Sequence, residues 1–93
     1  MEQAFITAWL EARAKAAALG IRMRPLSPEN AMQAARRSLS GHRPSDGFDA
    51  LAECSRLELS LEALAIRREF GSLFSDDEAN TALSRLLDAG YSF

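Results

Sequence analysis

The side chains of this sequence that could do chemistry gather in one segment, Arg36 to Ser45, which reads RRSLSGHRPS. It contains the only histidine of the chain, His42, and the cations Arg36, Arg37 and Arg43. Guanidinium groups bind carboxylates and phosphates through two parallel hydrogen bonds. We therefore expect these three arginines to contact an acidic partner protein or a phosphate group.

The same segment also has the pattern of a corner between two helices. Gly41 is suited to end the first helix, Pro44 cannot continue it, and Ser45 is a typical N-cap for the next helix. On this interpretation His42 is a solvated loop residue. The arginines then remain the candidates for binding.

The rest of the sequence does not favour catalysis or metal binding. His42 and Cys54 are the only histidine and cysteine, and no HxxxH or CxxC spacing surrounds them. The two flank different parts of a helix, so we expect Cys54 to be a small, partly buried residue rather than a nucleophile. The acidic run SDDE at 75–78 is a capping box. The sequence thus predicts a protein that is not an enzyme and that uses no cofactor or metal.

The composition predicts an all-α fold in a single helical domain, residues 1–93. Of the 93 residues 47% are hydrophobic, alanine and leucine dominate this fraction, and valine is absent. Alanine and leucine favour helices, whereas β-branched residues favour strands. One cysteine cannot form an internal disulfide, and neither a signal peptide nor a membrane span is recognisable. We expect a cytoplasmic protein that does not contact membranes.

Charge is divided unevenly along the chain. Residues 1–43 hold seven basic and three acidic side chains, a balance of +4, and residues 44–93 hold four basic and ten acidic ones, a balance of −6. Such an asymmetry favours association with an oppositely charged partner or head-to-tail pairing of two copies. The alternative is that the two halves neutralise each other within the fold.

Apolar periodicity and capping residues predict a small bundle of about five short helices. The alternation at Leu57–Leu59 is also typical of a short strand, but the chain has no second strand to pair with it. The helices are expected over residues 2–19, from a Ser27 cap to Gly41, from a Ser45 cap onward, from a Ser60 cap to Phe70, and from the capping box at 75–78 to Gly90.

Aromatic residues are the second group of candidates for binding a partner. Phe5 and Trp9 lie on the first helix, and Tyr91 and Phe93 lie at the other end of the chain. Aromatic side chains often anchor protein interfaces. The alternative is that Trp9 belongs to the core. The residues that we expect to face the core include Leu19, Ser55, Ala82, Leu83, Leu86 and Leu87.

Residues 35–71 resemble the VbhA-type antitoxins, which restrain Fic-domain AMP-transferases. The shared pattern is a Gly-x-x-Pro-Ser corner at 41–45, followed by a Glu-Leu-Ser-Leu-Glu step at 58–62. The family's inhibitory motif places a glutamate before the glycine, where this sequence has Ser40, and a serine or threonine where it has Arg36. The resemblance implies a small bacterial or mobile-element regulator of a larger protein. It does not imply inhibition through that glutamate.

We expect a non-enzymatic regulatory or interaction protein that is antitoxin-like or inhibitor-like. Its partner is another protein with an acidic surface, or a second copy of this chain. DNA binding of the helix-turn-helix or winged-helix type is the alternative, because residues 74–93 resemble one helix of a winged-helix domain or one repeat of the RecX family. The acidic run at 75–78 disfavours that alternative, since it repels phosphates.

Overall fold

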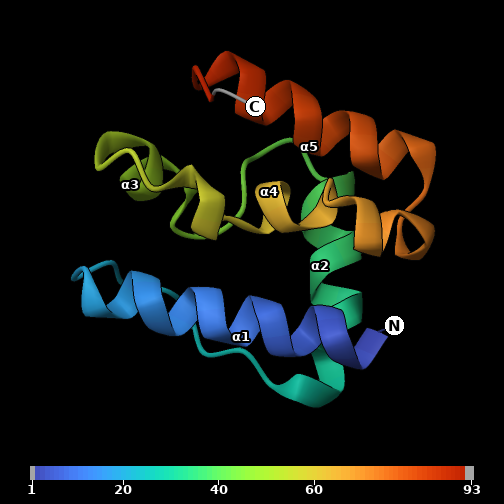
Figure 1. Ribbon diagram of the computed structural model, residues 1–93, viewed down its shortest axis with the longest axis horizontal. Helices are drawn as coiled ribbons and strands as arrows, with labels where there is room; N and C mark the ends of the chain where they lie inside the picture. The colour runs from blue at the N-terminus through green and yellow to red at the C-terminus, as the bar shows by residue number, and fades with distance from the viewer. Residues whose placement is uncertain (1, 92–93) are drawn as a thin grey trace.

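The computed structural model describes residues 2–91, and the regular elements of this range are all helical (Figure 1). No strand occurs within these residues, so the predicted all-α fold is confirmed. The number of α-helices also agrees with the predicted bundle of about five. They are α1 (Glu2–Ala18), α2 (Ala31–Ser40), α3 (Phe48–Glu53), α4 (Leu61–Ala65) and α5 (Asp76–Asp88), joined by the 3-10 turns η1 (Pro28–Asn30), η2 (Leu57–Leu59) and η3 (Arg68–Leu73).

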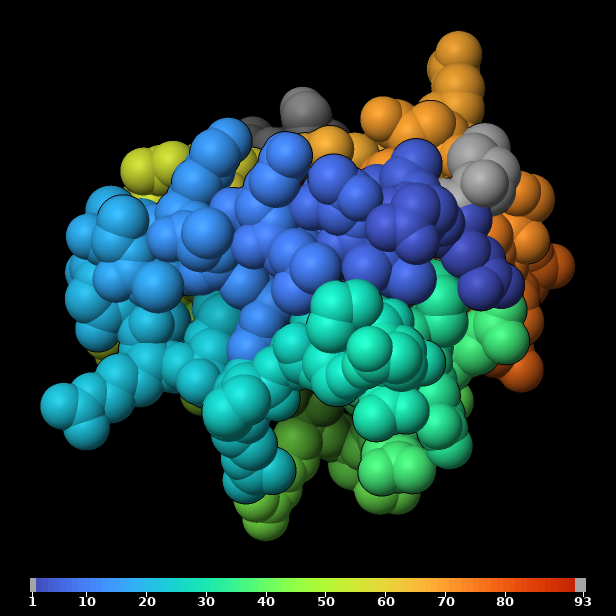
Figure 2. Space-filling model, turned by 90° about the horizontal axis from the view of Figure 1, so that it is seen from below, coloured from blue at the N-terminus to red at the C-terminus, as the bar shows by residue number. Residues whose placement is uncertain are grey.

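The short helix α4 lies at the centre of the fold, between α1 and α5 (Figure 1). α5 packs against α4 and α2, while α1 packs against η2, α4 and α2. Seen from below, α1 and the segment that leads into α2 cover one face of the molecule (Figure 2). All five residues of α4 are buried. A helix of this length gains its stability from packing on every side rather than from its own hydrogen bonds.

The buried apolar side chains form one cluster to which every α-helix contributes. Phe5 of α1 lies near its centre and is fully buried, and its ring meets those of Phe70 and Phe74 edge-on at centroid distances of 5.3 and 5.1 Å. Edge-to-face contacts of this kind add to the free energy of apolar burial. They join α1 to η3 and to the residue at the C-terminal end of η3, before α5 begins.

The predicted helix ends that are confirmed include the start of α5 and the C-terminal ends of α1 and α5. Ser75 and Glu78 form the capping box of α5, each side chain accepting a hydrogen bond from the backbone N–H of the other. Gly20 and Gly90 follow α1 and α5 with φ angles of 87° and 81°. Glycine adopts this left-handed conformation without the strain that a Cβ atom causes.

Two predicted N-caps are wrong. Ser27 precedes η1 rather than α2, and its hydroxyl donates to the Glu29 carboxylate instead of accepting from a backbone N–H. Ser45 does not cap α3, because that helix begins later, after Gly47, whose φ is 80°. The Ser45 hydroxyl donates to the carboxylate of Glu62. In both cases the serine hydroxyl donates a hydrogen bond to a glutamate carboxylate, whereas the sequence pattern predicted that it would accept one from a backbone N–H.

The fourth helix is shorter than expected, since α4 ends at Ala65 and not at Phe70. Arg67 is extended, with φ −65° and ψ 141°, and the chain then continues as η3, so Gly71 ends no α-helix. The change of direction lets Phe70 and Phe74 both enter the core. In a continuous helix these two residues, four apart, would lie on one face of a single rod.

Four residues that were expected to face the core are exposed. Leu19, Leu83 and Leu87 have exposed fractions of 46%, 38% and 56%, and Ser55 is exposed in a left-handed conformation with φ 58°. Helix α5 meets α4 and α2 along a narrower stripe than its sequence suggests. Ala82 and Leu86, both fully buried, form that stripe.

Candidate functional site

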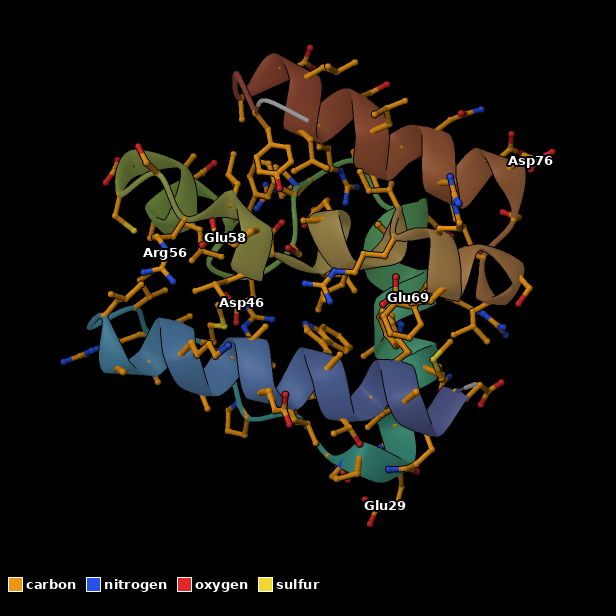
Figure 3. The ribbon with its side chains drawn as sticks, viewed as in Figure 1. Glu29, Asp46, Arg56, Glu58, Glu69 and Asp76 are labelled. Carbon is orange, nitrogen blue, oxygen red and sulfur yellow. The ribbon has the colours of Figure 1, made fainter. Side chains whose placement is uncertain are left out.

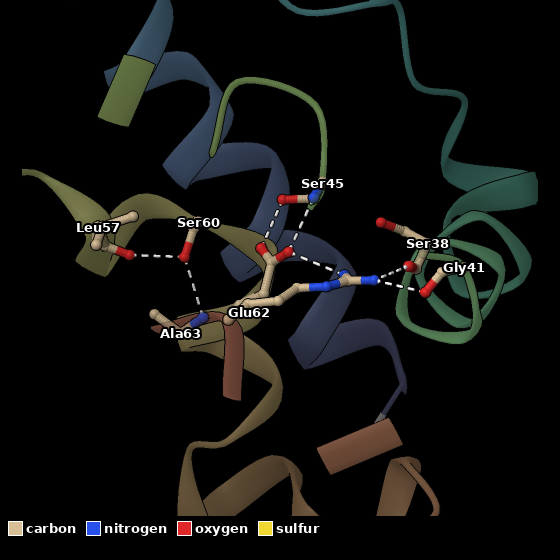
Figure 4. Close-up of polar contacts among 8 residues, drawn as sticks. Ser38, Gly41, Ser45, Leu57, Ser60, Glu62 and Ala63 are labelled. Atoms are coloured by element: carbon tan, nitrogen blue, oxygen red, sulfur yellow. Dashed lines mark hydrogen bonds and ion pairs between the residues drawn. The ribbon is translucent and has the colours of Figure 1, made fainter. Parts of the chain in front are cut away.

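A fully buried carboxylate, that of Glu62, lies beside the segment that was singled out in the sequence. The carboxylate accepts the backbone N–H of Ser45 at 2.8 Å, the Ser45 hydroxyl at 2.5 Å and Nη1 of Arg85 at 3.1 Å (Figure 4). The side chain of Glu62 is 0% exposed and that of Arg85 is 10% exposed. Removing two charges from water is costly unless they are paired and fully hydrogen-bonded, as they are in this network.

Arg85 also binds the C-terminal end of α2. Its Nη2 donates to the carbonyl oxygens of Ser38 at 3.0 Å and of Gly41 at 2.9 Å (Figure 4). The last carbonyls of a helix have no partner within the helix and carry the negative end of its dipole, so a guanidinium group stabilises them. One side chain of α5 thus fixes both Glu62 of α4 and the end of α2.

The local sequence explains how Glu62 reaches this position. The hydroxyl of Ser60 accepts the N–H of Ala63 at 3.1 Å and so starts α4. Glu62 therefore stands in the first turn, where a carboxylate is favourable to the helix dipole. Its neighbours Leu61 and Leu64 are buried, and they draw the whole helix into the core.

The sequence did not predict the ion pair between Glu62 and Arg85. The available signal was their apolar surroundings, because Glu62 lies within LEALA and Arg85 directly precedes Leu86 and Leu87. A charged residue inside a short apolar helix needs a partner, although the sequence does not say which one.

The corner is residues 41–47, the segment between α2 and α3. A second contact holds it, since Asp46 accepts the backbone N–H of Arg24 at 2.6 Å. The carbonyl of Arg24 in turn accepts from the guanidinium of Arg13 on α1. Burial lowers the pKa of Arg13, and the nearby charge of Asp46 opposes that shift. The corner is therefore attached to α1 through the linker as well as to α4.

The three arginines that were expected to bind a partner do not share one environment. Arg36 is exposed, but its Nη2 donates to the carbonyl of Leu73 at 3.1 Å, so it joins α2 to η3. Arg37 and Arg43 are exposed, and neither side chain has a hydrogen bond or ion pair with another residue between 2 and 91. These two cations are available to a partner.

Phe5 and Trp9 belong to the core. Phe5 is 0% exposed and Trp9 is 6% exposed, and their ring centroids lie 5.9 Å apart. The guanidinium carbon of Arg13 lies 5.9 Å from the centroid of the Trp9 ring and covers part of that ring. Both side chains are thus buried in the core, the alternative that was open for Trp9, and neither is exposed for contact with a partner. Phe93, which was named with Tyr91 as a candidate at the C-terminal end of the sequence, lies outside the described residues.

Two adjoining hollows lie beside His42. The larger, of about 510 Å³, is formed by residues 41–42 and one face of α5, including Asp77 and Asp88. The smaller, of about 350 Å³, shares His42 and Asp88 and extends to Asp49 and Phe48 of α3. Both are open to solvent, and charged and polar groups form a large part of their linings.

The other residues with reactive side chains are not brought together. Cys54 is exposed, contrary to the expected partial burial, and its Sγ lies 3.7 Å from the carbonyl oxygen of Leu51. Between residues 2 and 91 no group of three histidine, cysteine or acidic side chains is placed to hold a metal ion. None of the helices in that range is long and apolar enough to cross a membrane.

The remaining ion pair within residues 2–91 joins Arg56 and Glu58 on the surface (Figure 3). Nε of Arg56 lies 2.6 Å from Oε2 of Glu58, and the two side chains are 41% and 46% exposed. The hydrogen bond from Arg56 lowers the pKa of Glu58. This exposed pair is a natural reference for the buried pair of Glu62 and Arg85.

No protein-family model matches the chain, and no curated protein or solved structure is similar enough to it to count as a match.

Proposed function

We propose that this protein is a non-enzymatic regulator that binds and modulates a larger protein through the end of α2 and the corner. The observation that carries the proposal is the pair of uncommitted cations, Arg37 and Arg43, on a segment that a buried network holds in place. A guanidinium group on a fixed backbone loses less freedom on binding than one on a mobile loop, because only its side chain has to be ordered, so it contributes more to affinity.

The chemistry of these residues favours an acidic partner surface. Arg37 lies in the last turn of α2 and Arg43 two residues beyond Gly41. Two guanidinium groups so close in the chain are suited to carboxylates that lie side by side on a partner. The resemblance of residues 35–71 to antitoxins supports the same class of function, because this segment includes most of α2, the corner and α4.

DNA binding is the alternative, and the same two arginines favour it, since they could contact phosphates. The exposed carboxylates of Asp76, Asp77 and Asp88 on α5 disfavour it, because a reading helix with this charge repels the DNA backbone. We therefore rank a protein partner above DNA.

The test is capture of a partner from the native host by the tagged protein, followed by the same capture with Arg37→Glu and Arg43→Glu together. We expect one stoichiometric partner with the natural chain and its loss with the double variant. Arg68→Glu is the matched control, because Arg68 is exposed and its side chain also has no partner within residues 2–91.

Two results would contradict the proposal. One is the absence of any stoichiometric partner, and the other is a partner retained equally by the double variant and by the control. Duplex DNA is tested in parallel by fluorescence anisotropy. Tight binding that weakens steeply with salt and is lost in the double variant would establish the alternative instead.

A further inference from the structure

The face that surrounds His42 carries unpaired charges of both signs. Asp49, Asp77 and Asp88 line the two hollows, and all three are exposed. None of their side chains has a hydrogen bond or ion pair with another residue of the described chain. The one cation of the linings, Arg85, is already neutralised by Glu62. The hollows are therefore acidic.

An exposed cation stands directly beside these acidic hollows. Arg43 lies between His42 and Pro44, which both line the smaller hollow, but Arg43 itself lines neither. It is exposed and pairs with none of the three aspartates of its own chain. The same face thus offers an exposed guanidinium group and, next to it, a recess with carboxylates.

A surface with a cation next to an acidic recess is complementary to itself. A two-fold axis brings the same patch of two copies together, so that each pair of residues across the interface occurs twice. We propose that a second copy of this chain binds at this face, with Arg43 of each copy entering the recess of the other and pairing with Asp88. The proposal goes beyond the proposed function, because it needs no other partner.

The dimensions of the molecule and the lining of the recess are consistent with such a dimer. A standard interface covers about 800 Å² on each partner, roughly one seventh of the 5837 Å² surface of this chain. Pro44, Phe48 and Ala89 contribute apolar atoms to the smaller hollow, which also holds Asp49 and Asp88. Apolar contacts in this hollow supply affinity, whereas the charge pairs determine orientation and make the association sensitive to salt.

Charge reversal tests the proposal by sedimentation equilibrium at low ionic strength, from micromolar to millimolar chain. The natural chain is expected to form dimers that weaken as salt is added. Arg43→Glu alone and Asp88→Arg alone place like charges opposite each other, so each should raise the dissociation constant at least about tenfold. Circular dichroism checks that both variants fold.

Two further combinations of these substitutions, a mixture of the single variants and the double variant, distinguish specific pairing from a general effect of charge. An equal mixture of the two single variants should form a heterodimer tighter than either homodimer. In it the carboxylate introduced at position 43 of one copy faces the guanidinium introduced at position 88 of the other. The double variant R43E/D88R should regain the affinity of the natural chain. Arg68→Glu is the control. Arg68 is exposed and lines neither hollow, so this substitution should leave dimerisation unchanged.

A natural chain that stays monomeric throughout this range would overturn the proposal, and so would a mixture no tighter than its components. The outcome is separable from that of the proposed function. Dimerisation depends on Arg43 and Asp88, whereas partner capture depends on Arg37 and Arg43. Asp88→Arg should therefore weaken the dimer at least about tenfold and retain the captured partner.

Discussion

Removal of the Glu62 carboxylate should destabilise this protein more than any surface substitution. Glu62→Ala leaves the nearly buried guanidinium of Arg85 without its counter-charge, and it leaves the N–H and hydroxyl of Ser45 without their acceptor. Breaking a buried ion pair by removing one partner costs about 3–5 kcal/mol. A chain of this size has a free energy of unfolding of about 5–14 kcal/mol. The variant should therefore lose between about one fifth of its stability and all of it.

The assay is urea and thermal unfolding followed by circular dichroism. Each kcal/mol lowers Tm by about 4–8 °C in a domain of 60–100 residues, so Glu62→Ala should melt at least about 12 °C below the natural chain. Arg85→Met should lower the free energy of unfolding by a similar amount, because it leaves the buried carboxylate of Glu62 without its counter-charge. The double variant E62L/R85M should lose less than the sum of the single losses, since no charge is then left unpaired.

Glu58→Ala is the matched control. It also removes a glutamate that is paired with an arginine, but both of these side chains are more than two fifths exposed. Exposed pairs contribute about 0–1 kcal/mol. If Glu62→Ala cost less than about 1 kcal/mol, as the control should, the argument from burial and hydrogen bonding would be refuted.

Three further substitutions or conditions test the remaining structural arguments. Gly47→Ala should lose about 1–3 kcal/mol in urea unfolding, because φ is +80° and a Cβ atom would lie 2.6 Å from Cε of Met23; an unchanged midpoint would contradict this. Ser75→Ala should lose about 1 kcal/mol through loss of its cap, which the same assay checks, with helicity otherwise retained. Because the hydrogen bond from Arg56 lowers the pKa of Glu58, their pair stabilises the fold above the ordinary pKa of glutamate. That contribution disappears as the pH falls through the lowered pKa, so the small stability difference between the natural chain and Glu58→Gln should vanish in acid.

The parts of the fold that could be predicted from sequence are those set by neighbouring residues. The capping box of Ser75 and Glu78 needs only a spacing of three, and the left-handed positions of Gly20 and Gly90 need only the end of an apolar periodicity. Ser60 was correctly predicted to start α4. The hydroxyls of Ser60 and Ser75 accept backbone N–H groups three residues later, so the local pattern decides the structure at these positions.

The parts that could not be predicted depend on residues distant in the chain. Ser45 has the local pattern of an N-cap, but Glu62, seventeen residues later, takes both its N–H and its hydroxyl. Leu83 and Leu87 have the spacing of a buried face, but α4 is only five residues long and covers a narrow stripe of α5. A sequence gives the period of a helix but not the width of the surface that it meets.

The candidate site shows the same division. Arg36, Arg37 and Arg43 were selected by type alone, and the structure separates Arg36, which binds the carbonyl of Leu73, from the other two. Phe5 was also selected by type, but it is fully buried. Exposure and pairing, which decide availability to a partner, are properties of the folded chain.

The position of the buried pair links the stability of the fold to the proposed binding surface. A buried ion pair is a weak source of stability compared with apolar residues of the same volume, but it specifies one arrangement of the groups around it. Here those groups are the carbonyls of Ser38 in α2 and of Gly41 in the corner, together with the backbone N–H of Ser45. The segment between them contains Arg43. A network at this place fixes the orientation of the corner, so the variant R85M should weaken partner capture even under conditions in which it remains folded.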